Sequence, residues 1–146
     1  MLVKTLSEVG LVGCVKQKKK VRSRAKDLYT SELFAKARRY AETHYDKWFI
    51  LSAKYHLVES NDYIDTYDET LNEKTRAERK DWSEVVFEQI RDILPSPSSC
   101  TLYFHAGEKY REFLIRLLLD AGYSVRTPLE GLRIGKQLSW YKGHRA

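Results

Sequence analysis

The chain has 146 residues, a formal net charge of +6, 42% hydrophobic residues and 12% aromatic residues. This composition excludes a disordered chain and predicts a single domain over residues 1–146, with 1–8 as a poorly ordered or edge segment. The basic excess favours an anionic partner, DNA or RNA first.

The two cysteines are too few for a disulfide framework and are not spaced as zinc ligands, so we expect reduced thiols and a cytoplasmic location. The most apolar helical segment, FLIRLLL (113–119), is too short to span a membrane, and no membrane partner is expected. The sequence contains no phosphate-cradling glycine motif and no metal-ligand spacing, so neither a metal nor a cofactor is predicted. The oligomeric state is left open.

Hydrophobic periodicity divides the chain into alternating strands and helices. The predicted strands cover residues 9–15, 48–53, 100–106 and 123–127. Three longer helices are predicted over residues 31–45, 75–94 and 108–122, and a short terminal helix within 131–142. The first has Thr30 or Ser31 as its N-cap, the second begins with a Thr75–Glu78 capping box, and the third ends at Gly122. Residues 16–26 are predicted as a loop and 54–72 as a long connection.

This alternation predicts an α/β fold, a three-layer sandwich with a short, mostly parallel sheet of about four strands flanked by helices. In open α/β sheets, sites form outside the carboxyl ends of the strands. Candidate residues are therefore sought after the first three strands.

A basic loop follows the first strand. Seven Lys or Arg and no acid lie within residues 16–26. We predict that this loop binds the phosphates of DNA or RNA; the alternative is a solvated charged loop. The predicted contacts are Lys16, Lys18, Lys19, Lys20 and Arg22, with Cys14 at the root of the loop. Cys14 is either a substrate contact, as a thiolate nucleophile activated by the nearby cations, or a small core residue.

Polar side chains cluster where the second strand ends. Ser52 can donate or accept a hydrogen bond, Lys54 can pair with phosphate or act as an electrophile, and Tyr55 can stack on a base. The long connection that follows offers Tyr67 as a contact and Asp68 as a carboxylate that stabilises a cation or orients water. The alternative is that its acids are solvated and balance the basic loop.

A histidine ends the third strand. His105 precedes Gly107, which permits close backbone approach, and Glu108, which suits the first turn of a helix. His105 is a candidate catalytic group; the alternative is a structural histidine.

Several motifs occur in an order that resembles a small uncharacterised family of bacterial and phage proteins. They are LVGCVKQK (11–18), AKDLYTSELFAKARRYAE (25–42), WFILSAKYHLVES (48–60) and IDTYDETL (64–71). The family pattern is V-S-C-x-K-x-K, D-L-Y-x-S-x-L-F, L-S-A-K-Y-G-L-L and P-Y-D-x-T-L, and the match covers about residues 9–141. Three positions depart from the pattern: His56 stands in place of Gly, Thr66 in place of Pro, and Arg133 falls within a glycine-rich segment.

The family is distantly similar to YaaA-like peroxide-stress DNA-binding proteins and to uracil-DNA-glycosylase-type α/β sandwiches. That similarity implies a nucleic-acid-acting enzyme, such as an N-glycosidic-bond hydrolase, a DNA-repair glycosylase or another base-modifying enzyme. Asp68 would stabilise the cationic sugar, and His105 or Lys54 would take the charge that develops on the departing base. Tyr55 would stack on an extruded base. Two alternatives remain: a DNA- or RNA-binding module without chemistry, and an enzyme acting on free nucleosides or nucleotides.

Overall fold

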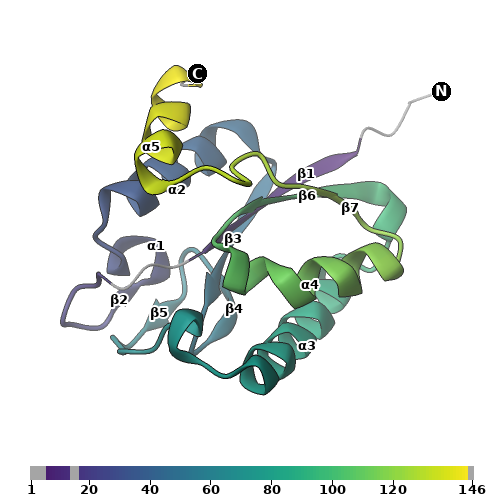
Figure 1. Cartoon of the computed structure of the whole chain (residues 1–146), viewed down its shortest axis with the longest axis horizontal. Coiled ribbons are helices and arrows are strands. Elements are labelled where there is room, and N and C mark those ends of the chain that lie inside the picture. Colours follow the sequence, from purple (N-terminus) through teal and green to yellow (C-terminus); the bar gives the residue numbers. More distant parts are fainter. Residues whose placement is uncertain (1–5, 14–16, 145–146) are drawn as a thin grey trace.

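The computed structural model describes residues 6–13 and 17–144, which form three layers (Figure 1). A five-stranded sheet lies between two helical layers, in the order β4 (His56–Glu59), β3 (Lys47–Ser52), β1 (Ser7–Gly13), β6 (Cys100–His105) and β7 (Ser124–Arg126). One face is covered by α2 (Glu32–His44) and α5 (Ile134–Gly143), the other by α3 (Arg76–Ile93) and α4 (Glu108–Asp120). The predicted α/β sandwich is therefore confirmed.

The central strand β1 is apolar because both of its faces are covered. Val9, Leu11 and Val12 are fully buried. β1 runs parallel to β3 and to β6, and Val12 is in register with both Ile50 and His105. The carboxyl ends of β3, β1 and β6 therefore meet at one edge of the sheet.

The sheet has one more strand than the sequence predicted. β4 lies within the predicted long connection and pairs antiparallel with β3, with Ser52 opposite His56. Residues 53–55 form the turn between the two strands, and His56 follows in a left-handed conformation with φ +66°. A three-residue turn followed by a left-handed residue is a common hairpin connection, usually with glycine at that last position.

The main helices begin and end close to the predicted residues. The Ser31 side chain accepts the backbone N–H of Phe34 at the start of α2, and α3 has the predicted Thr75–Glu78 capping box. Gly122, just after α4, has φ +96°, the left-handed conformation expected of a glycine stop. Two short 3-10 helices, Leu71–Glu73 and Pro97–Ser99, precede α3 and β6.

The described part of the predicted basic loop is folded. β2 (Ser23–Arg24) pairs antiparallel with β5 (Tyr63–Ile64), and α1 (Ala25–Leu28) follows. The apolar residues Ala25, Leu28 and Tyr29 are buried and attach the segment to the core. We call residues 17–30 the basic lobe; Figure 1 shows its β2 and α1 beyond the carboxyl ends of the central strands. The loop prediction was wrong in this respect because it followed the charges and not these anchors.

The first strand starts earlier than predicted. Ser7 and Glu8 belong to the central strand β1, so within the described residues the predicted edge segment is part of the sheet interior. Across the described ranges, no helix combines the length and the apolar character needed to cross a membrane.

Candidate functional site at the carboxyl edge of the sheet

Ser52 ends β3 and is completely buried. Its backbone carbonyl accepts the indole N–H of Trp82 at 2.8 Å, which ties the strand end to α3. Its hydroxyl accepts the backbone N–H of Tyr55 at 3.0 Å and donates to the hydroxyl of Tyr67 at 2.8 Å. The first contact shapes the β3–β4 turn, and the second leads out of the core.

Two tyrosine hydroxyls continue from Ser52 toward the basic lobe. The Tyr67 hydroxyl lies 2.7 Å from the hydroxyl of Tyr29, so Ser52, Tyr67 and Tyr29 form a hydrogen-bonded series that we call the hydroxyl chain. Tyr55 packs edge-on against Tyr67, with ring centroids 5.5 Å apart. The members of the chain come from a strand, a connection and the lobe, so only the tertiary fold brings them together.

Lys18 covers the hydroxyl chain from the side of the lobe. Its ammonium nitrogen lies 4.3 Å from the ring centroid of Tyr67 and 5.9 Å from that of Tyr29, within the range of cation–π attraction. Lys18 and Tyr29 also form an antiparallel β-bridge. The lobe therefore holds one cation against the strand end.

The neighbouring cations of the lobe face solvent. Lys19, Lys20 and Arg22 are all exposed. Arg22 lies 3.8 Å from the carboxylate of Asp65, and both side chains are more than half exposed, so this pair is weak. One acid of the long connection thus balances one cation of the lobe. This agrees with the alternative in which solvated acids of the connection balance the basic loop.

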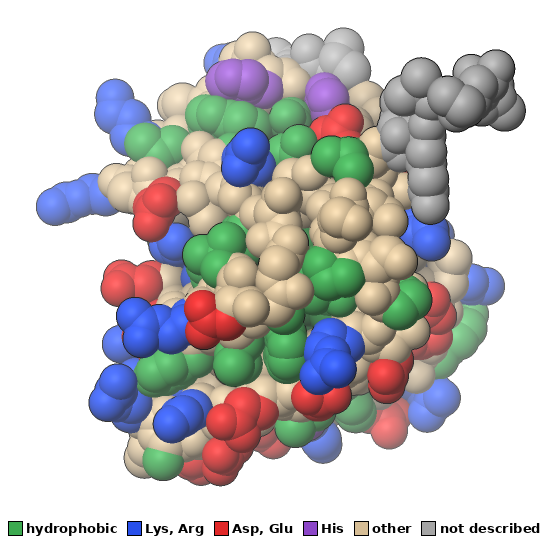
Figure 2. Space-filling model, turned by 90° about the vertical axis from the view of Figure 1, so that its right-hand side faces the viewer, with side chains coloured by type: hydrophobic (Ala, Val, Ile, Leu, Met, Phe, Trp, Pro, Cys, Tyr) green, Lys and Arg blue, Asp and Glu red, His purple; other side chains and the backbone are tan. Residues whose placement is uncertain are grey.

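Charge is distributed differently at the other end of the strands. Figure 2 views the molecule from the side where β1 begins, and Lys, Arg, Asp and Glu side chains alternate over it. No field of one sign builds up on a surface where opposite charges alternate.

His105 is buried at the end of β6, with its ring between two tyrosine hydroxyls. Its Nε2 faces the Tyr45 hydroxyl, and its Nδ1 lies 2.7 Å from the Tyr141 hydroxyl. Burial, with a smaller contribution from His44, lowers the pKa of His105 to about 4. Burial also raises the pKa of Tyr45 and Tyr141 far above the usual value. The three groups are therefore neutral at physiological pH.

His105 and Ser52 are not neighbours. They lie on the two strands that flank β1, and Ser52 is two residues beyond the position level with His105. Strand spacing and rise place their Cα atoms about 12 Å apart. A direct hydrogen bond is excluded at this separation.

The predicted site residues therefore divide into two sets. The structure brings Lys18, Ser52, Tyr55 and Tyr67 together at the end of β3. Lys54 is exposed with its ammonium 5.4 Å from the Tyr55 ring centroid, and Asp68 is exposed on the connection. Gly107 is the N-cap of α4 and Glu108 is exposed in its first turn, whereas Cys14 and Lys16 lie outside the described residues.

Three tyrosines at these two strand ends, Tyr29, Tyr45 and Tyr141, were not predicted as site residues. Tyr45 and Tyr141 lie 60 and 36 residues from His105 along the chain, so no local spacing relates them to it. The D-L-Y segment of the family pattern is the one signal that pointed to Tyr29.

Within residues 6–13 and 17–144, no group of three or more His, Cys, Asp or Glu side chains is placed to hold a metal ion. The chemistry that the β3 end offers is hydroxyl hydrogen bonding, one cation and aromatic stacking.

Comparison with known proteins gives one match. The model of DUF6884, described as a family of unknown function, matches residues 9–143. No curated protein and no solved structure matches the chain. The family resemblance seen in the motifs is thereby confirmed at this level, and the more distant likeness to peroxide-stress proteins and DNA glycosylases stays a prediction.

Proposed function

This chain belongs to the DUF6884 family, and we propose that it binds nucleic acid through its basic lobe. The observation that carries the proposal is the placement of the lobe. Lys18 is fixed over the Tyr67 ring at the end of β3, while Lys19, Lys20 and Arg22 remain exposed beside it. One fixed cation with three exposed cations beside it, at a strand's carboxyl edge, suits a phosphate backbone.

The order of the lobe supports this use. Backbone bonds join the Lys19 N–H to the Leu28 carbonyl at 2.8 Å and the Thr30 N–H to the Gln17 carbonyl at 3.0 Å. A folded lobe loses less conformational entropy on binding than a free loop would. The partly exposed Tyr55 and Tyr67, next to the cations, supply aromatic rings of the kind on which unpaired bases stack.

The test is binding of fluorescent single- and double-stranded DNA and RNA at several salt concentrations. The variant is Lys19→Ala, Lys20→Ala, Arg22→Ala, which leaves Lys18 on the Tyr67 ring. The matched control is Lys47→Ala, Arg91→Ala, Arg116→Ala, three exposed cations away from the lobe with the same change in charge. We expect the lobe variant to lose affinity at least tenfold and about two units of log–log salt slope, and the control to lose much less. Equal losses in the two variants would refute the lobe as the contact surface.

The hydroxyl chain favours a second candidate function, hydrolysis of an N-glycosidic bond. A buried Ser52 joined to Tyr67 and Tyr29 beside Lys18 is an arrangement that can fix a water or a base at the strand end. Water would add its hydroxyl to the sugar carbon while the departing base takes the proton. Asp68 directly follows Tyr67, Lys54 lies two residues after Ser52, and both are exposed. Asp68 would stabilise the cationic sugar, and Lys54 would stabilise the departing base.

Catalysis is assayed in the same samples by heating with alkali, which cleaves a strand at any site that has lost its base. Strand breaks that disappear in Asp68→Asn would support the hydrolase; their absence with intact binding would leave the binding module. Affinity that stops growing at one nucleotide would instead indicate a nucleoside or nucleotide enzyme.

A further inference from the structure

Two hollows lie along the outer surface of α2. The first, about 410 Å³, is bounded by α2 and α5 and is lined by Lys36, Tyr40 and Lys142 among others. The second, about 480 Å³, is bounded by α2 and the basic lobe and includes Lys19 and Lys26. Volumes of this size are typical of ligand sites.

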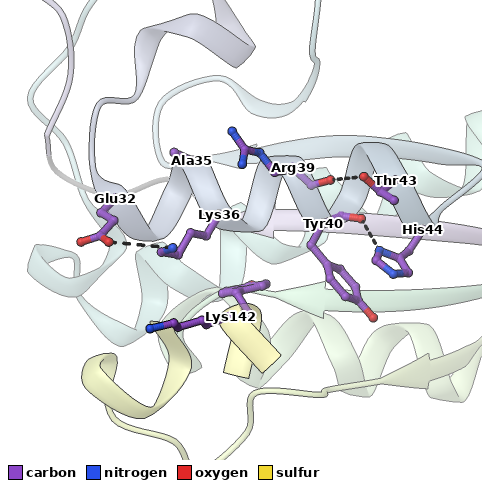
Figure 3. A pocket seen from close by; sticks show the side chains of 9 residues that line it. Glu32, Ala35, Lys36, Arg39, Tyr40, Thr43, His44 and Lys142 are labelled. Atoms are coloured by element: carbon purple, nitrogen blue, oxygen red, sulfur yellow. Dashed lines mark hydrogen bonds and ion pairs between the residues drawn. The ribbon is translucent and has the colours of Figure 1, made fainter. Parts of the chain in front are cut away.

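The two hollows meet on α2. Ala35 and Arg39 line both of them. Ala35 has a small side chain, and Arg39 places a cation on the part of α2 that the two hollows share. Figure 3 shows Lys36 and Lys142 on the side of the first hollow and Arg39 directed away from Lys142, across α2.

Cations outnumber carboxylates along this surface. The lining residues include six Lys or Arg and three Asp or Glu. Two of the three acids, Asp27 and Glu42, are held by a single arginine, Arg38, at 2.9 and 3.2 Å. The third, Glu32, lies 3.9 Å from Lys36. The lining residues therefore carry more formal positive than negative charge, from the lobe across Arg39 to α5.

We propose that a single strand of nucleic acid follows this surface, which we call the α2 track and define by Lys19, Lys26, Arg39, Lys36 and Lys142. This inference rests on the proposed function and extends it to a path leading away from the lobe. α2 has 13 residues and is about 20 Å long, so the track spans several nucleotides. Hollows between helices admit one strand, whereas the width of a duplex would limit its contacts to the outermost cations.

The experiment compares two oligothymidylates, a tetramer and a 16-mer, with a 16-base-pair duplex. The track variant is Lys36→Ala, Arg39→Ala, Lys142→Ala, beside the lobe triple variant and the control triple variant. Alanine suits all three helical positions, and thermal unfolding verifies that the track variant is folded. The variant Lys36→Arg, Lys142→Arg keeps the charges and serves as a second, conservative test.

We expect the track variant to bind the tetramer as the wild type does, because the tetramer occupies the lobe alone. Its affinity for the 16-mer falls about tenfold at moderate salt, with about two units less log–log slope, and the duplex is affected less. The arginine variant retains wild-type affinity. A lobe variant that loses binding while the track variant matches the control overturns the track alone. Equal losses for the 16-mer and the duplex overturn the single-stranded path, and a wild type that binds no oligonucleotide overturns the proposed function itself.

Discussion

β3 and β6 lie on either side of β1 and end at the same edge of the sheet, with a polar side chain at each end. The hydroxyl of Ser52, on β3, is linked through Tyr67 and Tyr29 to the basic lobe. The ring of His105, on β6, has both nitrogens facing tyrosine hydroxyls inside the molecule. Hydrogen bonds link one strand end to the basic lobe and the other to tyrosines of the helical layer.

The difference separates the candidate site at the end of β3 from an internal clamp at the end of β6. Tyr45 follows α2 and Tyr141 belongs to α5, so His105 fastens both helices to the sheet. A buried polar network of this kind contributes stability when all of its members are paired. The hydroxyl chain instead ends at the buried Tyr29 of the basic lobe, beside the partly exposed Lys18. Position at a carboxyl edge alone does not distinguish the two cases; the partners do.

The largest expected effect comes from removing the clamp. His105→Ala leaves a cavity under α5 and removes the partner of two tyrosine hydroxyls, so the free energy of unfolding should fall by about 3 to 4 kcal/mol. Urea denaturation measures this change. His44→Ala, at an exposed position stacked on Tyr40, is the control and should cost less than about 1 kcal/mol. Similar values for the two variants would contradict the clamp.

The clamp should also depend on pH. The pKa of His105 is about 4 in the folded chain, against 6.5 for the ordinary side chain. Between these values the unfolded chain binds more protons, so the contribution of His105 is complete above pH 6.5 and is lost as the pH falls toward 4, a total of about 3 kcal/mol. Urea denaturation at pH 7.5, 6, 5 and 4 measures the slope. His105→Gln, which cannot titrate, should be less stable at pH 7.5 and show a flatter profile; an unchanged slope would assign the pH dependence to other groups.

Breaking the hydroxyl chain should cost less. Tyr67→Phe keeps the ring under Lys18 and removes the acceptor of the buried Ser52 hydroxyl, so we expect a loss of about 1 to 2 kcal/mol in the free energy of unfolding. Tyr55→Phe keeps the ring that packs on Tyr67 and serves as the control, with an expected change under about 0.5 kcal/mol. If Tyr67→Phe abolishes strand cleavage and leaves binding intact, the hydroxyl chain has a catalytic role. If both cleavage and binding are unchanged, the role of the hydroxyl chain is structural.

Local sequence patterns predicted the parts of this molecule that are decided locally. Apolar periodicity and capping residues located α2, α3 and α4, because helix faces and caps are properties of neighbouring residues. The rule that sites lie at strand ends led to Ser52, and the length of the connection led to Tyr67. These two side chains are hydrogen-bonded in the structure, and their role in a site stays a prediction.

The remaining features depend on contacts between distant segments. The partners of His105 come from residues after α2 and within α5, and no spacing rule connects them. The basic lobe was read from its charges, although its fold is set by the buried Ala25, Leu28 and Tyr29. β4 was missed because the usual hairpin signal, a glycine after the turn, is replaced by His56. The glycine in the family pattern at this position was the available clue.

His56 offers the smallest and most local test at the β3 end. Its φ of +66° is strained for a residue with a Cβ, and glycine adopts it without that cost, although glycine also gains entropy in the unfolded chain. We therefore expect His56→Gly to raise the free energy of unfolding by about 0.5 to 1 kcal/mol, measured by urea denaturation. Lys54→Gly, in the same turn but without a positive φ, should lower it slightly. Since His56 pairs with Ser52, relief of strain here should leave the hydroxyl chain in place, and nucleic-acid binding should not change. A loss of stability in His56→Gly would mean that packing of the half-buried imidazole outweighs the backbone strain, and a loss of binding would place His56 itself among the contacts.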